Sequence, residues 1–125
     1  MKEMVYKPKG ERVLLYHGVY LDHDYYVISM GTHPCAYVKL INENPEVAEN
    51  VPCHGGITYN EKYLRLPDGE IKGNFIGWDY AHSGDYMGYY GETHSYEWDG
   101  QRYTTEYIVN ECLEVIGNLI WRFEK

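Results

Sequence analysis

Hydrophobic and polar residues alternate along much of this chain with the two-residue period of β-strands. Short apolar runs rich in β-branched and aromatic residues predict strands at residues 11–20, 25–30, 36–41, 63–66 and 71–78. Polar or Pro/Gly-containing stretches separate these runs, most clearly at residues 21–24 and at 67–69 (Pro-Asp-Gly). Because short connections of this kind favour hairpins, the pattern predicts a mostly antiparallel sheet.

A helical period replaces the strand period near the C-terminus. Between residues 105 and 121, apolar residues form two adjacent stripes, Ile108, Cys112, Val115 and Leu119 and, beside them, Val109, Leu113, Ile116 and Ile120. The polar residues Asn110, Glu111, Glu114 and Asn118 occupy the other side, and Thr104 or Thr105 can cap the first turn. Earlier in the chain, Pro45 favours a short helix over residues 45–49, with a loop as the alternative.

These elements predict an α+β fold, a mostly antiparallel β-sheet with one C-terminal α-helix packed across it. A length of 125 residues suits a single domain, residues 1–125. Within it we expect a lead-in at 1–10, a β-rich part at 11–104 and the helix at 105–121.

Charge and composition narrow the class of partner. The formal net charge is −8, and no Lys/Arg cluster exceeds the Lys7-Pro8-Lys9 fragment, so duplex nucleic acid is not expected as a partner. A small anionic ligand stays compatible, because backbone amides or a bound cation can hold it. Neither a signal-like N-terminus nor an apolar run of membrane-spanning length is visible, so we expect no membrane association and a cytoplasmic protein with reduced cysteines.

The richest polar segment follows the last predicted strand, within residues 74–86 (NFIGWDYAHSGDY). Asp79, His82 and Asp85 supply two carboxylates and an imidazole, and His54 is the natural fourth group. Such a set suits a divalent metal such as Zn, Mn or Mg, which would activate water. Without metal, Asp79 would orient His82 as a general base.

A second polar segment, residues 53–59 (CHGGITY), lies about twenty residues upstream. The Gly55 and Gly56 amides could face developing negative charge, and Thr58 and Tyr59 could line a pocket. Cys53 is a weaker thiol-nucleophile candidate.

Structural roles account for the same residues equally well. An Asp at a strand end commonly caps a turn, and a Gly pair commonly makes a tight turn that needs positive φ. His17, His23 and His94 show no partner in the sequence and are expected to be surface or structural residues.

Three motifs in order, residues 31–38 (GTHPCAYV), 54–59 (HGGITY) and 77–86 (GWDYAHSGDY), resemble a family of small proteins encoded by bacteriophages and prophages. The likeness runs from about residue 25 to the C-terminal helix. It implies expression inside an infected bacterium, where small phage proteins often counter host defence. It also implies functional roles for His33, His54, Gly55, Gly56, Thr58, Tyr59, Asp79, His82 and Asp85.

Three functions are compatible with these residues. The first is a small hydrolase, with or without metal, acting on a nucleotide-like or phosphorylated small molecule through His54, Asp79, His82 and Asp85. The second is a non-catalytic protein that sequesters such a molecule, for example a defence signal, with Trp78 and tyrosines stacking on a base. The third is a module that inhibits a host enzyme through an acidic, tyrosine-rich face.

Overall fold

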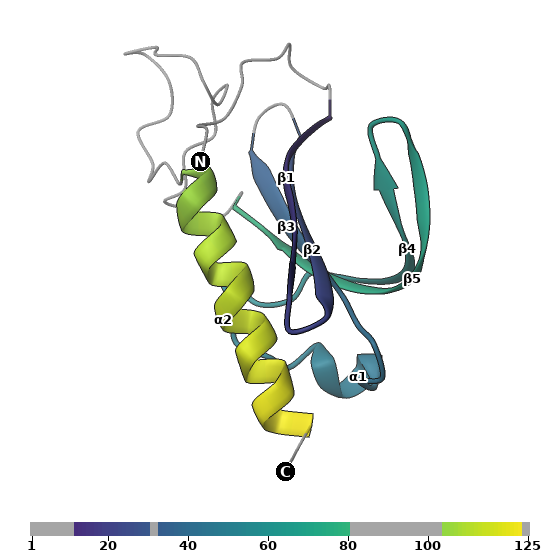
Figure 1. Ribbon diagram of the computed structural model, residues 1–125, viewed down its shortest axis with the longest axis vertical. Coiled ribbons are helices and arrows are strands. Elements are labelled where there is room, and N and C mark those ends of the chain that lie inside the picture. Colours follow the sequence, from purple (N-terminus) through teal and green to yellow (C-terminus); the bar gives the residue numbers. More distant parts are fainter. Residues whose placement is uncertain (1–11, 31–32, 81–103, 124–125) are drawn as a thin grey trace.

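The computed structural model describes residues 12–30, 33–80 and 104–123 and confirms the α+β fold. All strand pairs in its five-stranded sheet are antiparallel. In spatial order the strands are β1 (Val13–Tyr20), β2 (His23–Ser29), β3 (Pro34–Lys39), β5 (Gly69–Asp79) and β4 (Tyr59–Leu66). Helix α2 and the β4–β5 hairpin stand on opposite sides of the central strands (Figure 1).

The first hairpin is tighter than residues 21–24 suggested. Only Leu21 and Asp22 form the turn, with φ of 49° and 68°, while His23 already begins β2. Two consecutive positive φ values are typical of the turns whose twist matches that of a hairpin. They are uncommon for a leucine, whose Cβ disfavours this region.

Both predicted helices form. Asn44 caps α1 (Pro45–Ala48) by accepting a hydrogen bond from the Glu46 amide. Helix α2 (Thr105–Phe123) is capped by Thr104, whose hydroxyl accepts from the Tyr107 amide at 3.0 Å. No helix in the described ranges is both long and apolar enough to cross a bilayer.

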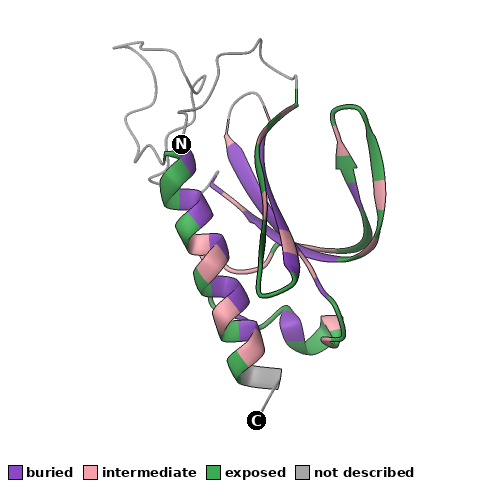
Figure 2. Cartoon of the chain, viewed as in Figure 1, coloured by how far each residue is buried: buried purple, intermediate pink, exposed green. Residues whose placement is uncertain are grey.

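The sheet is buried on both faces, so the molecule has two apolar clusters. On one face the buried stripe of α2 covers the sheet (Figure 2). This cluster includes Val27, Ala36, Val38, Ile76, Trp78, Tyr80, Ile108, Cys112, Ile116 and Leu119. The other face holds Tyr26, Ile28, Cys35, Tyr37, Leu64 and Phe75. Because side chains alternate along a strand, consecutive residues of β5 reach different clusters.

Candidate functional site

The two polar segments predicted from the sequence meet where β5 ends. Asp79 is the last residue of β5 and pairs with Cys35 of β3. The Thr58 amide donates to the Gly77 carbonyl at 2.9 Å, which fixes the chain just before β4 against β5. The Thr58 hydroxyl then donates to Oδ2 of Asp79 at 3.1 Å. This contact orients the Asp79 carboxylate.

A cavity of about 280 Å³ opens beside this carboxylate. It is lined by Met30, His33, Cys35, Tyr37, Thr58, Tyr59, Trp78 and Asp79. We call it the Asp79 cavity. Its lining includes the predicted ligand-binding residues His33, Thr58, Tyr59 and Trp78. Trp78 is only 1% exposed and its indole N–H donates to the Tyr80 hydroxyl, so it supports the wall more than it offers a stacking surface.

Tyrosine rings form the wall between β3 and β4. The rings of Tyr37 and Tyr59 meet edge to face, with centroids 5.1 Å apart. Burial, together with neighbouring Tyr63, raises the pKa of Tyr59 to about 12, and burial also raises the pKa of Tyr37. Both phenols therefore stay protonated at neutral pH, and the Tyr59 hydroxyl donates its one hydrogen to the Tyr63 carbonyl.

His54 lies against the helix side of the sheet. Its ring stacks on Tyr80 with centroids 4.5 Å apart and an interplanar angle of 19°, and its backbone amide donates to Glu111 of α2 at 2.7 Å. The Tyr80 hydroxyl also donates to Glu111, and it accepts from the Trp78 indole at 3.1 Å. Burial, followed by the Glu111 hydrogen bond, raises the pKa of Tyr80. The His54 amide and the side chains of Trp78, Tyr80 and Glu111 form one polar network under α2.

The two polar segments adjoin, but the side chains of His54 and Asp79 do not line one pocket as predicted. Asp79 lies between Trp78 and Tyr80 in sequence, so its side chain points to the opposite face from theirs. His54, Gly55 and Gly56 are not among the residues that line the Asp79 cavity. Gly55 and Gly56 have φ of 70° and 84°, which supports the tight-turn interpretation. The segment thus carries the chain from the His54 network to the Thr58–Asp79 contact.

The sequence pattern predicts Glu111 on the outer side of the helix, and this prediction is wrong. Glu111 is half-buried and accepts hydrogen bonds from Tyr80 and from the His54 amide. A position beside the Ile108–Cys112 stripe was the one available signal, since residues flanking a stripe lie at its edge.

The structure bears on the predicted metal site and on the predicted Cys53 nucleophile in different ways. His82, Asp85 and His94 lie outside the described residues. Within the described ranges, no three His, Cys, Asp or Glu side chains gather as a metal site. Cys53 is a free thiol, and burial together with Glu111 raises its pKa to about 12, which disfavours the thiolate that a nucleophile needs.

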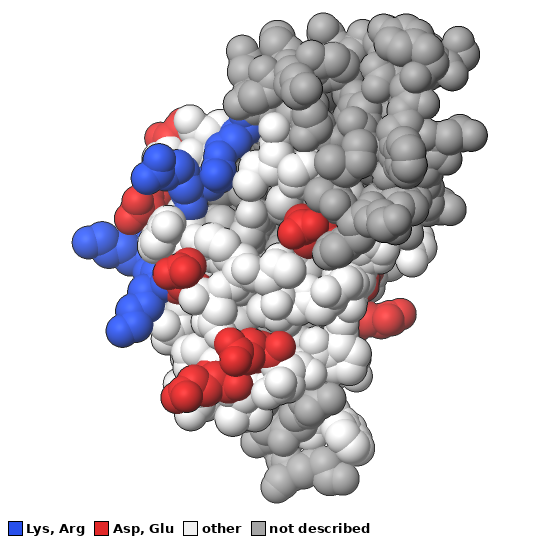
Figure 3. Space-filling model, turned by 180° about the vertical axis from the view of Figure 1, so that it is seen from behind, with Lys and Arg blue, Asp and Glu red and all other residues white. Residues whose placement is uncertain are grey.

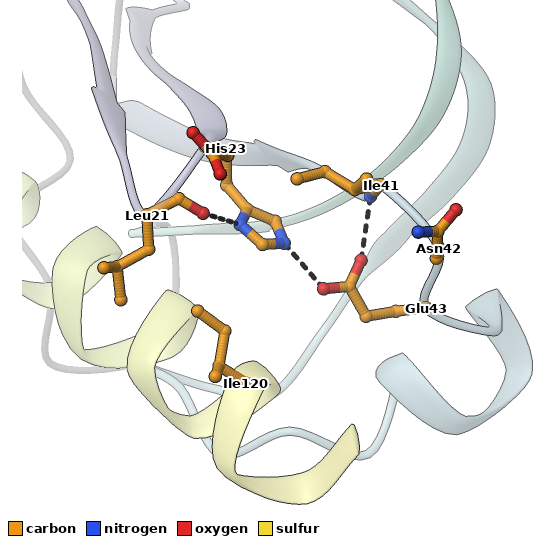
Figure 4. Close-up of a pocket in the computed structure, with 7 residues that line it drawn as sticks. Leu21, His23, Ile41, Asn42, Glu43 and Ile120 are labelled. Carbon is orange, nitrogen blue, oxygen red and sulfur yellow. Dashed lines mark hydrogen bonds and ion pairs between the residues drawn. The ribbon is translucent and has the colours of Figure 1, made fainter. Parts of the chain in front are cut away.

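A larger cavity, of about 540 Å³, lies at the other end of the sheet beneath the first hairpin (Figure 4). There the His23 ring donates through Nδ1 to the Leu21 carbonyl at 2.8 Å and lies 2.6 Å through Nε2 from Glu43. The second Glu43 oxygen accepts from the Ile41 amide at 2.8 Å. The His23 side chain is 4% exposed, so the surface alternative predicted for it is wrong and the structural one holds. Both ring nitrogens are engaged, which favours a structural lock over catalysis.

Comparisons of the chain with protein-family models, with curated proteins and with solved structures found no match.

Proposed function

We propose that this protein binds a nucleotide-like small molecule in the Asp79 cavity. The observation that carries the proposal is the Thr58–Asp79 contact at the rim of a cavity walled by tyrosines. A carboxylate held by a neighbouring hydroxyl is a preorganised acceptor for the hydroxyl groups of a sugar. The Tyr59 ring supplies an aromatic edge for a base.

The dimensions and chemistry of the cavity support a small ligand. A volume of about 280 Å³ lies just below the range that is usual for small-molecule sites, roughly 300–1,000 Å³. Donors and acceptors converge in it from three directions, with His33 and Cys35 at the start of β3, Thr58 and Tyr59 at the start of β4, and Asp79 at the end of β5. Convergence of a few polar groups on a partly apolar hollow is typical of specific binding sites.

Hydrolysis of the bound molecule is the second candidate function. The oriented Asp79 carboxylate favours it, because such a group can act as a general base or as one ligand of a divalent metal. In this version His82 and Asp85, which lie outside the described residues, would complete the reacting centre with Asp79. In this mechanism His54 would have no direct contact with the ligand. It would instead hold the Gly55–Gly56 turn that positions Thr58.

The resemblance to phage-encoded proteins supplies a biological setting for the proposal. A small acidic protein made inside an infected bacterial cell could sequester a nucleotide signal of host defence. Sequestration requires binding alone, so it needs only the groups that surround the Asp79 cavity.

Turnover and sequestration are separated by one experiment. The purified chain is incubated with nucleosides and with mono-, di- and cyclic nucleotides, with and without Mn²⁺ or Zn²⁺, and then denatured. A binding protein returns its ligand intact on chromatography, whereas a hydrolase yields products. If no compound is retained before denaturation and none is converted, the proposed function is wrong.

A further inference from the structure

A second cavity adjoins the Asp79 cavity across the Tyr37–Tyr59 pair. It measures about 310 Å³ and is lined by Arg12, Tyr37, Tyr59, Tyr63, Leu64 and Arg65. Tyr37 and Tyr59 line both cavities, so the two hollows lie on either side of one aromatic partition. The end at Asp79 carries a carboxylate, and the end at Arg12 carries guanidinium groups.

Arg12 is held in place by the backbone of a distant strand. It precedes β1, at one edge of the sheet, and its Nη1 donates to the carbonyl of Arg65 in β4, at the opposite edge, at 2.9 Å. This bond uses one of five guanidinium N–H groups, so the fork can still donate to an anion. Its charge also reaches the partition: it opposes the rise that burial causes in the pKa of Tyr37 and Tyr59.

Positively charged side chains lie on the side of the molecule that carries the β4–β5 hairpin. The chain as a whole is acidic, with a net charge of −8. Figure 3 nevertheless shows the described Lys and Arg side chains gathered on one side of the face in view, the side of the β4–β5 hairpin. Asp and Glu side chains lie among these cations (Figure 3), so attraction of an anion would come from the guanidinium groups that line the cavity and not from a net positive field.

We infer that the Arg12–Arg65 cavity holds the phosphate group of a ligand whose hydroxyl-bearing end binds at Asp79. The inference rests on the proposed function and makes it more specific: the ligand is a phosphorylated nucleoside that passes the Tyr37–Tyr59 partition. Arginine suits this role because its planar fork matches the geometry of phosphate oxygens.

The test compares nucleosides with their phosphates by isothermal titration calorimetry. The four ribonucleosides and their 5′-monophosphates are titrated into the wild-type chain and into Arg12→Gln, Arg65→Gln and Lys62→Gln. Arg65→Gln keeps the backbone carbonyl that Arg12 contacts, so it removes charge without breaking that hydrogen bond. Lys62→Gln removes the same charge from an exposed β4 residue outside the cavity lining.

We expect the best monophosphate to bind at least tenfold more tightly than its nucleoside. Arg12→Gln and Arg65→Gln should each reduce this ratio several-fold, while Lys62→Gln leaves it nearly unchanged. A nucleoside that binds as tightly as its phosphate, or a ratio that neither arginine variant changes, overturns the inference and leaves the proposed function standing. If neither class of compound binds, the inference is wrong, and the proposed function is wrong as well if the di- and cyclic nucleotides of the wider panel are not retained or converted.

Discussion

Asp79 owes its place in the cavity to its position within β5. The strand alternates between the two apolar clusters, so a residue between Trp78 and Tyr80 must face away from α2. The pairing of Asp79 with Cys35 then sets it beside β3, and the Thr58 hydroxyl fixes the carboxylate. A shift of one residue in register would send this carboxylate into the apolar interface with the helix.

The first prediction concerns this carboxylate. Asp79→Asn keeps an oxygen that can accept from Thr58 but removes the negative charge. We expect at least a tenfold loss of nucleotide affinity, measured by calorimetry, with the melting temperature changed by only a few degrees. Thr58→Val serves as the partner variant, and because it releases the carboxylate it should weaken binding less. Unchanged affinity in Asp79→Asn would remove Asp79 from the site.

The cysteines give a second prediction. Burial raises the pKa of Cys35 to about 12, burial with Glu111 does the same for Cys53, and the pKa of Cys112 is also raised. Since the thiolate is the reacting form, all three should alkylate slowly in the folded chain at pH 7.5 and quickly after unfolding. Mass spectrometry after timed iodoacetamide treatment measures this. Rapid labelling of Cys53 in the folded protein would revive the thiol-nucleophile hypothesis.

Among the secondary-structure elements, the buried His23–Glu43 pair joins the first hairpin to the segment between β3 and α1. His23 begins β2, and Glu43 lies between β3 and α1, so their contact ties the first hairpin to the α1 region. Hydrogen bonding of His23 to the Leu21 carbonyl also holds the turn in its unusual positive φ. A strained turn of this kind persists only where its surroundings fix it.

A third prediction follows from the acid side of this pair. Burial alone would raise the pKa of Glu43, but hydrogen bonds from the Ile41 amide and His23 outweigh it and hold the pKa below its usual value. A carboxyl group whose pKa is lower in the folded state than in the unfolded state stabilises the fold at pH values above its unfolded pKa. That stabilisation is lost as the pH falls through its folded pKa. The melting temperature should therefore fall from pH 5 to pH 3.

Glu43→Gln tests this assignment. It should lower stability at pH 7 by about 3 kcal/mol, because one partner of a buried pair remains. It should also flatten the decline in melting temperature between pH 5 and pH 3. Glu46→Gln, an exposed change in the neighbouring α1, is the matched control and should alter stability by only a few tenths of a kcal/mol. Equal pH profiles in wild type and Glu43→Gln would contradict the assignment.

Two glycines provide a fourth prediction with opposite signs. A Cβ on Gly77 would lie 2.5 Å from the Tyr37 ring and 2.8 Å from the Ala36 carbonyl, so Gly77→Ala should cost about 1–3 kcal/mol. A Cβ on Gly117 of α2 meets nothing within 4 Å. Gly117→Ala should therefore stabilise the chain by about 0.5–1 kcal/mol, the helix propensity difference. Urea unfolding of both variants measures the pair; a stabilising Gly77→Ala would contradict the close approach.

Elements with a regular period were predictable, and contacts between distant residues were not. The alternation in 71–78 and the stripes in 105–121 located β5 and α2 because burial itself produces those periods. The partnership of His23 with Glu43 depends on the register of two hairpins, which no local pattern encodes.

Site residues divide in the same way. Thr58 and Asp79 stood out because polar groups interrupt apolar runs there, and they do meet. Arg12 gave no signal, since its role depends on a carbonyl at the far edge of the sheet. Glu111 was misplaced because helical periodicity describes one helix alone and does not include Tyr80.

In the molecule as a whole, the two faces of the sheet differ in what they carry. The α2 face supplies the larger core cluster and a polar network around Glu111. The opposite face holds the smaller core cluster and opens into the Asp79 cavity and the Arg12–Arg65 cavity. One layer can therefore stabilise the fold while the other presents groups to a ligand.

Amide chemical shifts recorded during a titration show directly whether a nucleotide-like molecule occupies the Asp79 cavity. A ¹⁵N-labelled chain is titrated with the tightest-binding nucleotide. We expect saturable shifts at Thr58, Tyr59, Asp79 and the start of β3, with His23 and Glu43 unaffected. Shifts centred on His23 and Glu43, or an absence of saturable shifts at Thr58 and Asp79, would contradict the proposal.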